Sequence, residues 1–272
     1  MSDQEKFAVL SAARRVWAVG SIHGERARLE ALHDALWPRL DAGDRLVYLG
    51  NVLGRGPDVA GTLNELLAFR CGVMSREPDE APHVVILRGS QEEMWQKLLQ
   101  LQFATDPRGV LDWMLTQGIG ATLTAYGSSV EEALQRVRGG AVGLTRWTQD
   151  LRRSMQRNEG HVAFMAALRR ACVVEGTGSG LLFVNAGLDP TRPLEAQRDS
   201  FWWSSGGFGR LAEPYAGFAR VVRGFAPGRE DDSPGIVETE YTVTVDAGCG
   251  FGGPLTAACF TPDGALVDRV EA

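Results

Sequence analysis

Short apolar runs that end at a glycine alternate with helix-like stretches through the first hundred residues. The runs cover residues 15–20, 45–50 and 83–89, and the helical stretches that follow them end near Trp37, cover 58–69 and cover 91–101. Strands that alternate with helices indicate βαβ units, and continuous apolar runs are typical of strands buried between two layers. The chain is therefore expected to build a sheet that is covered by helices.

The rest of the chain divides into a helical part and a second β-rich part. Residues 107–170 show amphipathic spacing and predict a helical insertion. Apolar β-patterned runs return after Cys172, at residues 181–185, 220–224, 241–246, 255–260 and 265–270. The sequence Thr261-Pro262-Asp263-Gly264 predicts a hairpin turn between the last two. We expect an N-terminal tail over 1–14 and a single α/β domain over 15–272.

Charge and hydropathy exclude several classes of partner. The 272 residues carry a formal net charge of −6 and no long basic run, which argues against binding to nucleic acid or to an anionic membrane. No apolar stretch approaches the roughly 18–20 residues that cross a bilayer, and the first ten residues, MSDQEKFAVL, do not resemble a signal peptide. The four cysteines lack metal-site spacing. A cytoplasmic protein is expected.

Glycine-bearing turns close the predicted strands, and in open α/β sheets ligands bind at the carboxyl ends of strands. The turns read GSIHGE (20–25), LGNVLGRGPD (49–58), LRGSQEE (87–93), FVNAGLDP (183–190), VVRGFAP (221–227) and DAGCGFGGPLTAA (246–258). In this order and spacing, over about residues 15–270, they resemble the calcineurin-like metallophosphoesterases, specifically the phosphoprotein phosphatases with their bacterial serine/threonine phosphatase and diadenosine tetraphosphatase relatives. The resemblance implies a four-layer α/β (α+β) fold: a β-sandwich of two mixed sheets flanked by helices, with a helical insertion.

The resemblance also implies which positions would carry the chemistry, and most of them are changed. The family pattern is GDxHGE, GDxxDRGPD, LRGNHE, VHAGxxP and VxGHTP, with two Mn, Fe or Zn ions. Its six metal ligands fall on Ser21, His23, Asn51, Ser90, Asn185 and Phe225, of which only His23 keeps a ligand of the family. Gln91 stands at the position of the general-acid histidine, and Gly54 at that of the aspartate that orients it.

These replacements remove the hydrolytic mechanism. A two-metal site needs several hard carboxylate and imidazole ligands around ions about 3.5–4 Å apart. Hydroxyl, amide and phenyl side chains cannot hold such a pair, and Gln91 cannot protonate a leaving group as an imidazolium does. Carboxylates without a cation would also repel one another. The sequence therefore predicts no metal cofactor and no catalysis: a pseudophosphatase with a binding, scaffolding or regulatory role toward a protein partner.

Two arginines favour a retained anion pocket in this cleft. Arg55 stands at the family's phosphate-binding DRG position and Arg88 precedes the LRGSQEE turn, so both are suited to a phosphate, a sulfate or a phosphorylated ligand. Structural pairing with Glu25, Glu92 or Asp58 is the alternative. A further phosphate-binding arginine of the family falls on Ser205.

Two other functions stay open at this point. One is a metal-dependent phosphoesterase, either a protein phosphatase or a dinucleoside polyphosphate hydrolase, with residual or rerouted activity through a displaced metal site. The other is a structural subunit whose cleft binds nothing. Metal binding would support the phosphoesterase, and stabilisation by anions would separate a binding protein from a structural subunit. The pair Trp202-Trp203 is expected to belong to the core.

Overall fold

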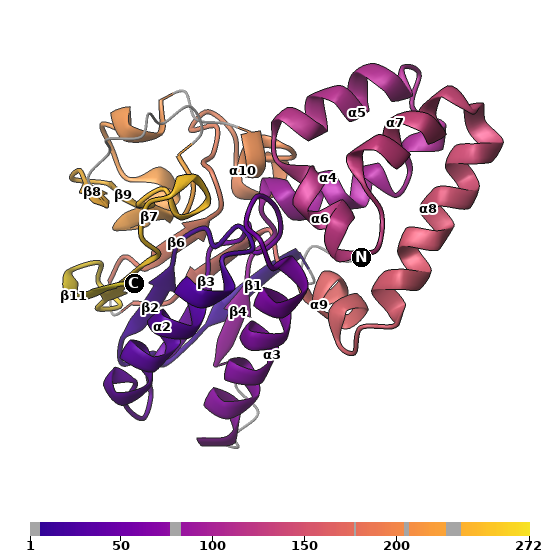
Figure 1. Ribbon diagram of the computed structural model, residues 1–272. Helices are drawn as coiled ribbons and strands as arrows, with labels where there is room; N and C mark the ends of the chain where they lie inside the picture. The colour runs from indigo at the N-terminus through magenta and orange to yellow at the C-terminus, as the bar shows by residue number, and fades with distance from the viewer. Residues whose placement is uncertain (1–5, 77–82, 177, 204–206, 227–234) are drawn as a thin grey trace.

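The computed structural model describes residues 6–76, 83–176, 178–203, 207–226 and 235–272 (Figure 1). Its described strands form two mixed sheets. The first sheet has the order β1-β5-β6-β7-β9-β8 and the second has the order β11-β10-β2-β3-β4. The strands are β1 (Phe7–Leu10), β2 (Val16–Val19), β3 (Arg45–Tyr48), β4 (Val84–Ile86), β5 (Ala171–Val174), β6 (Leu181–Val184), β7 (Arg220–Arg223), β8 (Ile236–Glu238), β9 (Thr242–Val245), β10 (Thr256–Phe260) and β11 (Leu266–Glu271).

The two faces of each central strand pack into different layers. In β2, Ala18 faces the cluster between the two sheets, where it packs with Val47, Phe183 and Val222. Its neighbour Trp17 belongs to the cluster beneath the helices. Successive side chains of a strand point to opposite faces, so a strand that is buried on both faces must be apolar throughout. The continuous apolar runs of the sequence are explained by this double burial.

Helices cover the outer faces of both sheets. On the second sheet, α2 and α3 pack through Leu32 and Leu63. On the first sheet, Phe201 and Trp202 of α10 pack against Leu182. The helices are α2 (Arg26–Leu36), α3 (Val59–Arg76), α4 (Ser90–Leu98), α5 (Pro107–Thr116), α6 (Ile119–Ala125), α7 (Val130–Arg138), α8 (Gly140–Gln156), α9 (His161–Ala167) and α10 (Ser200–Trp203). The predicted layers, two mixed sheets flanked by helices, are confirmed.

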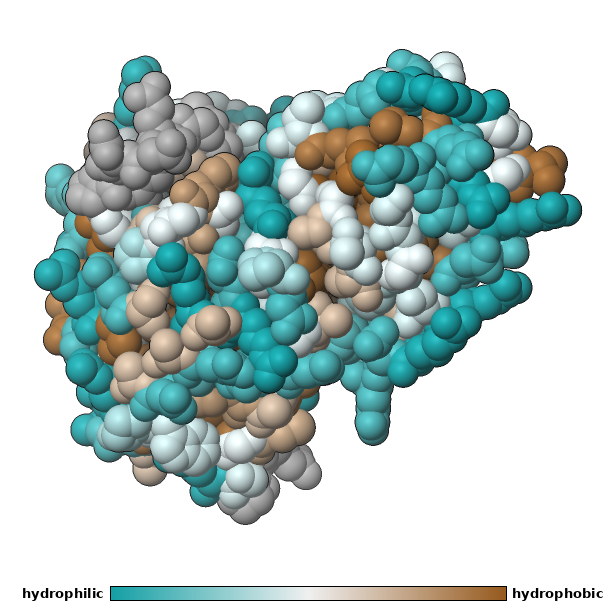
Figure 2. Space-filling model, viewed as in Figure 1, coloured by the Kyte–Doolittle hydropathy of each residue, from teal (hydrophilic) through white to brown (hydrophobic). Residues whose placement is uncertain are grey.

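The helical insertion is also present. Helices α5 to α9 form a lobe beside the sheets (Figure 1). Local capping explains where two of them begin: the Asp106 side chain accepts from Gly109 N ahead of Pro107, and the Ser129 side chain accepts from Glu132 N. Figure 2 shows a mostly hydrophilic face on which apolar side chains gather over α5 and α7.

Two sequence-based expectations need correction or completion. The expected tail over 1–14 contains β1, which pairs in parallel with β5 from Phe7↔Ala171 to Leu10↔Val174. The four apolar residues of β1 form the edge strand of the first sheet. So short an apolar run does not by itself predict a strand, because its pairing with β5 is a long-range contact. Of the tryptophan pair, Trp202 is buried as expected, and Trp203 is partly buried against Trp113.

Within the described residues, no helix is long and apolar enough to span a membrane.

Candidate functional site

The turns singled out in the sequence meet at one end of the two sheets. Ser21 and Asn51 follow the adjacent parallel strands β2 and β3, and Ser90 opens α4 after β4. Asn185 and Phe225 follow β6 and β7, which are parallel neighbours in the other sheet. Because parallel strands end at the same edge, their following turns lie together. The structure thus brings the predicted positions to one place.

Four of these side chains form a buried hydrogen-bonded network, which we call the polar core: Ser21, Asn51, Ser90 and Asn185. Ser21 Oγ donates to Gly224 O (2.7 Å) and accepts from Asn51 Nδ2 (3.1 Å). Asn51 Oδ1 accepts from Ser90 Oγ (3.0 Å), and Asn185 Oδ1 accepts from Ser90 N (3.2 Å). None of the four is more than 3% exposed. The polar core is a neutral network whose groups satisfy one another.

Glu92 holds the turns around the polar core together, whereas the sequence motifs suggested it only as a partner for an arginine. Its buried carboxylate accepts from Asn51 N (2.9 Å), Leu53 N (2.9 Å) and Gly89 N (2.8 Å). Burial raises the pKa of the Glu92 carboxyl, while the backbone N–H groups oppose that shift. A glutamate three residues after Gly89 at the start of a helix was the available sequence signal. Its oxygens are committed to the backbone, so Glu92 has a structural role.

The backbone at this site is held in left-handed conformations that non-glycine residues rarely adopt. His23, Asn51 and Arg55 have φ angles of +56°, +55° and +46°. Hydrogen bonds hold each of them, namely His23 N to Asn51 O (2.7 Å), Asn51 N to Glu92 and Arg55 N to Gly118 O (3.2 Å). Strain of this kind persists where the surroundings fix the backbone. The turns are therefore preformed.

His23 is enclosed by apolar surface and carries no hydrogen bond on its ring. It is 1% exposed, and neither ring nitrogen has a partner among the described residues. The rings of Phe225 and Phe251 lie edge-on to it, with centroid distances of 5.7 and 6.0 Å, and Gly250 leaves no room for a Cβ beside it. Burial, helped by the charge of Arg55, lowers the pKa of His23 to about 3. The imidazole is therefore neutral at physiological pH.

Gln91 and Gly54 are complementary replacements. Gln91 Nε2 donates to Gln117 O (2.7 Å). A Cβ at Gly54 would collide with the Gln91 amide, and Gly54 itself has φ +93°. The glutamine side chain thus occupies the space that an aspartate at position 54 would need, and an amide held in this way cannot protonate a leaving group.

Arg55 is the cation at this site. Its guanidinium lies over the Phe251 ring at 4.2 Å, and its Nε is buried without a hydrogen-bond partner. No ion pair is formed with Glu25, Glu92 or Asp58, the partners considered from the sequence, and Asp58 pairs instead with Arg26 (3.4 Å). Partial burial lowers the pKa of Arg55, yet an arginine stays charged. A positive charge without a carboxylate partner among the described residues lies beside a neutral core.

Arg88 does not share this environment, so the expected convergence of the two arginines is corrected. Its guanidinium forms an ion pair with Glu93 (3.2 Å), and its carbonyl accepts from Trp202 Nε1 (2.9 Å). The acid lies five residues further on, in the first turn of α4, which draws the arginine side chain toward that helix. Ser205, the third expected phosphate-binding position, lies outside the described residues.

The donor set at the expected metal positions does not fit a transition-metal pair. Such ions require several convergent thiolate, imidazole or carboxylate ligands. Over the part of the chain that the structure describes, no group of three or more His, Cys, Asp or Glu side chains could hold a metal ion. The side chains of Ser21, Asn51 and Ser90 bond to one another, the Asn185 amide bonds to backbone groups, and the phenyl groups of Phe225 and Phe251 lie against the His23 ring.

Comparisons with known proteins identify the fold. No protein family model and no curated protein sequence matches the chain. Among solved structures, a candidate diadenosine tetraphosphatase superposes with a TM-score of 0.53 at 20% identity, covering 98% of both chains. A hypothetical protein from Pyrococcus horikoshii gives 0.52 at 16% identity, covering 95% of this chain and 87% of its own. A serine/threonine phosphatase from Saccharomyces cerevisiae, similar to human phosphatase PP5, gives 0.50 at 11% identity, covering 98% and 84%. The chain has the calcineurin-like metallophosphoesterase fold that its turns predict.

Proposed function

We propose that this protein is a pseudophosphatase that acts by binding rather than by hydrolysis. The observation that carries the proposal is the polar core, which fills the expected metal positions with neutral groups that satisfy each other. A metal site would leave its ligand atoms free to converge on a cation. Here the oxygen and nitrogen atoms are already committed to hydrogen bonds, and a cation would have to break them.

The side chains beside the polar core supply none of the usual steps of phosphoester hydrolysis. Attack on phosphorus needs a hydroxide, which this fold family generates on metal ions. Departure of the alkoxide needs a proton donor with a pKa near the working pH. The amide of Gln91 does not titrate in this range, and His23, with its pKa lowered to about 3, is neutral and enclosed. Without a metal-generated hydroxide and without a proton donor for the leaving group, the protein cannot hydrolyse a phosphoester by this route.

Beside the polar core, Arg55 supplies a site for an anion. The guanidinium offers several N–H groups, no carboxylate of the described residues neutralises it, and the neutral polar core does not repel a negative ligand. A phosphate, a sulfate or a phosphorylated group on a protein partner fits this chemistry, and a scaffolding or regulatory role follows. The four cysteines form no disulfide, which suits the cytoplasmic location that we propose.

A hydrolysis assay tests the loss of catalysis. Purified protein is incubated with p-nitrophenyl phosphate, a phosphopeptide or a dinucleoside polyphosphate, each with added Mn²⁺ or Mg²⁺. The rate is expected to match that of a His23→Ala, Gln91→Ala double variant. Metal-dependent turnover well above that control would overturn the proposal and favour a phosphoesterase with a rerouted metal site.

A thermal-shift titration tests the anion site separately. Because a ligand that binds the folded state raises its apparent stability, millimolar phosphate is expected to raise the Tm of the wild type more than that of Arg55→Gln. Arg108→Gln is the matched control, since Arg108 is exposed and pairs with Asp112 in α5. Equal shifts in all three proteins would reflect general salt stabilisation only. That result would remove the anion site and favour a structural subunit whose cleft binds nothing.

A further inference from the structure

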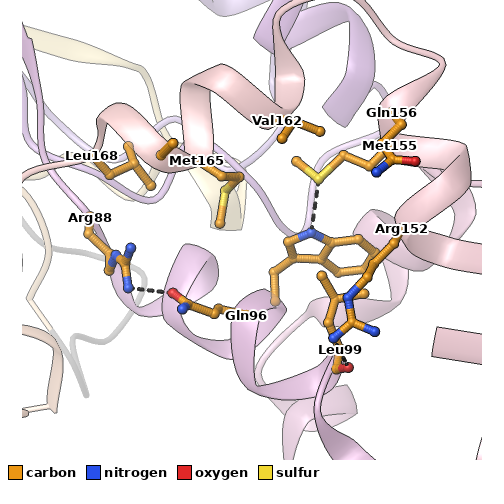
Figure 3. Close-up of a pocket in the computed structure, with 11 residues that line it drawn as sticks. Arg88, Gln96, Leu99, Arg152, Met155, Gln156, Val162, Met165 and Leu168 are labelled. Atoms are coloured by element: carbon orange, nitrogen blue, oxygen red, sulfur yellow. Dashed lines mark hydrogen bonds between the residues drawn. The ribbon is translucent and has the colours of Figure 1, made fainter. Parts of the chain in front are cut away.

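A pocket lies at the junction of the helical lobe and the sheets, and it shares no residue with the polar core. It has a volume of about 470 Å³ and is bounded by α4, the end of α8 and α9 (Figure 3). Cavities that hold small molecules have volumes of about 300–1,000 Å³. Side chains of all three helices line it, together with Arg88, Leu99 and Leu168.

The walls of this pocket are apolar and adaptable. Leu99, Met155, Met165 and Leu168 line it, and Val162 on α9 is 49% exposed. Methionine side chains are flexible and polarisable, so they can adjust to a hydrocarbon of varied shape. The apolar part of a ligand that lies between α4 and α9 would therefore contact these side chains along its length.

One wall carries a hydrogen-bond donor that is only weakly satisfied. Trp95 is fully buried, and its Nε1 donates to the thioether of Met155 at 3.4 Å, the bond drawn as a dashed line in Figure 3. A thioether sulfur is a weak acceptor. An oxygen on a bound molecule would be a better acceptor for this N–H than the thioether is.

The charged groups of the lining are both arginines, with no acidic residue beside them in the lining. They lie on opposite sides of the pocket in Figure 3. Arg88 is neutralised by Glu93 at 3.2 Å. Arg152 donates Nη2 to Leu99 O (2.6 Å) and forms no ion pair among the described residues. A guanidinium has five N–H donors, so Arg152 keeps several for a ligand.

We propose that this pocket binds an amphipathic carboxylate, such as a medium-chain fatty acid. The carboxylate pairs with Arg152, where charge-assisted hydrogen bonds give the strongest contacts. The hydrocarbon chain lies against Leu99, Met155 and Met165. Charge complementarity selects an anion over a neutral or cationic molecule of the same shape. The proposal does not depend on the loss of catalysis at the polar core.

Titration calorimetry with decanoate tests this assignment on the full chain. Decanoate is expected to bind the wild type with a Kd below about 1 mM. In Arg152→Gln the Kd is expected to rise about tenfold, because a charge-assisted contact is lost. The matched control is Arg153→Gln, the next residue of α8, whose side chain is 64% exposed and pairs with Asp150, and which should bind decanoate as the wild type does.

Two further measurements decide the outcome. Ala166→Glu places an acid on the exposed rim of the pocket. Because position 166 is exposed, the variant should fold normally, and the new carboxylate should weaken decanoate binding by repulsion. Decyltrimethylammonium, a cation with the same chain, should not bind. Absence of binding to the wild type at millimolar decanoate, equal affinity in Arg152→Gln, or equal binding of the cation would each overturn the proposal.

Discussion

A carboxylate returned to the polar core should destabilise the protein in a pH-dependent way. Asn51 is 0% exposed, and its Nδ2 donates to Ser21 Oγ, which in turn donates to Gly224 O. In Asn51→Asp an oxygen replaces that nitrogen and faces the lone pairs of Ser21 Oγ. The bond is lost, and a negative charge stands in a buried site close to the Glu92 carboxylate, which accepts from Asn51 N.

The size of the effect follows from the pKa of the new carboxyl. Burial without a cation raises the pKa of an aspartate, and a rise of about two units above its unfolded value of about 3.9 costs about 3 kcal/mol at pH 7.5. When folding raises the pKa of an acid, the folded state loses stability at pH values above the pKa of the unfolded state. This loss is recovered as the pH falls through the pKa of the folded state. About half of the loss should therefore be recovered at pH 5.

Urea denaturation of the wild type and the variant at pH 7.5 and pH 5 measures this difference, in which the intrinsic pH dependence of the protein cancels. Asn158→Asp is the control, because Asn158 is only half-buried and donates to Ser154 O at the end of α8. Equal stability of Asn51→Asp and the wild type would refute the reasoning. Restoration of its stability by Mn²⁺ would refute it as well, since that would show a site one carboxylate short of holding metal.

Three further predictions concern the same turns. Because folding lowers the pKa of His23 to about 3, the unfolded state gains a proton on this residue first as the pH falls. His23 therefore removes about 2 kcal/mol of stability between pH 7 and pH 5, and His23→Gln should lose less stability than the wild type over this range in urea denaturation. Gly54→Ala should destabilise the protein by about 2 kcal/mol or more, because position 54 has a positive φ and the new Cβ collides with Gln91. In a double-mutant cycle, Gln91→Ala should recover only the part of the lost stability that comes from the collision. Glu92→Gln should cost about 3 kcal/mol in urea denaturation, because its amide nitrogen would face backbone N–H donors that the carboxylate now accepts from. A loss below about 0.5 kcal/mol in the last variant would contradict the role of Glu92 as the clamp between the turns.

The sequence predicted the convergence of distant turns because a simple rule governs it. Turns that follow parallel strands must lie at one sheet edge, so the predicted βαβ units with their glycine-bearing turns favoured a common site, and the family resemblance assigned Ser21, Asn51 and Ser90 to it. The helical insertion was predictable for a similar reason, since amphipathic periodicity and capping residues act locally. The chemistry of the site also follows from these residue types, as none of the three is a good ligand for a transition metal.

Other features depend on contacts that local sequence does not encode. Phe251 lies against both His23 and Arg55 from a glycine-rich turn about two hundred residues further along the chain, and no local motif predicts these contacts. Arg88 is turned toward α4 by a nearby acid, which the motif position alone could not show. Strand β1 is defined only by its pairing with β5. Each of these is a tertiary contact that overrides the local pattern.

Elemental analysis of metal content tests the central claim most directly. The purified protein is incubated with Mn²⁺ and Zn²⁺, freed of unbound ions by gel filtration and analysed for metal per chain, alongside His23→Ala. The polar core and the enclosed His23 ring leave no convergent ligand set among the described residues, so both proteins should carry well under one ion per chain. One or more ions per wild-type chain, lost in His23→Ala, would contradict the pseudophosphatase account.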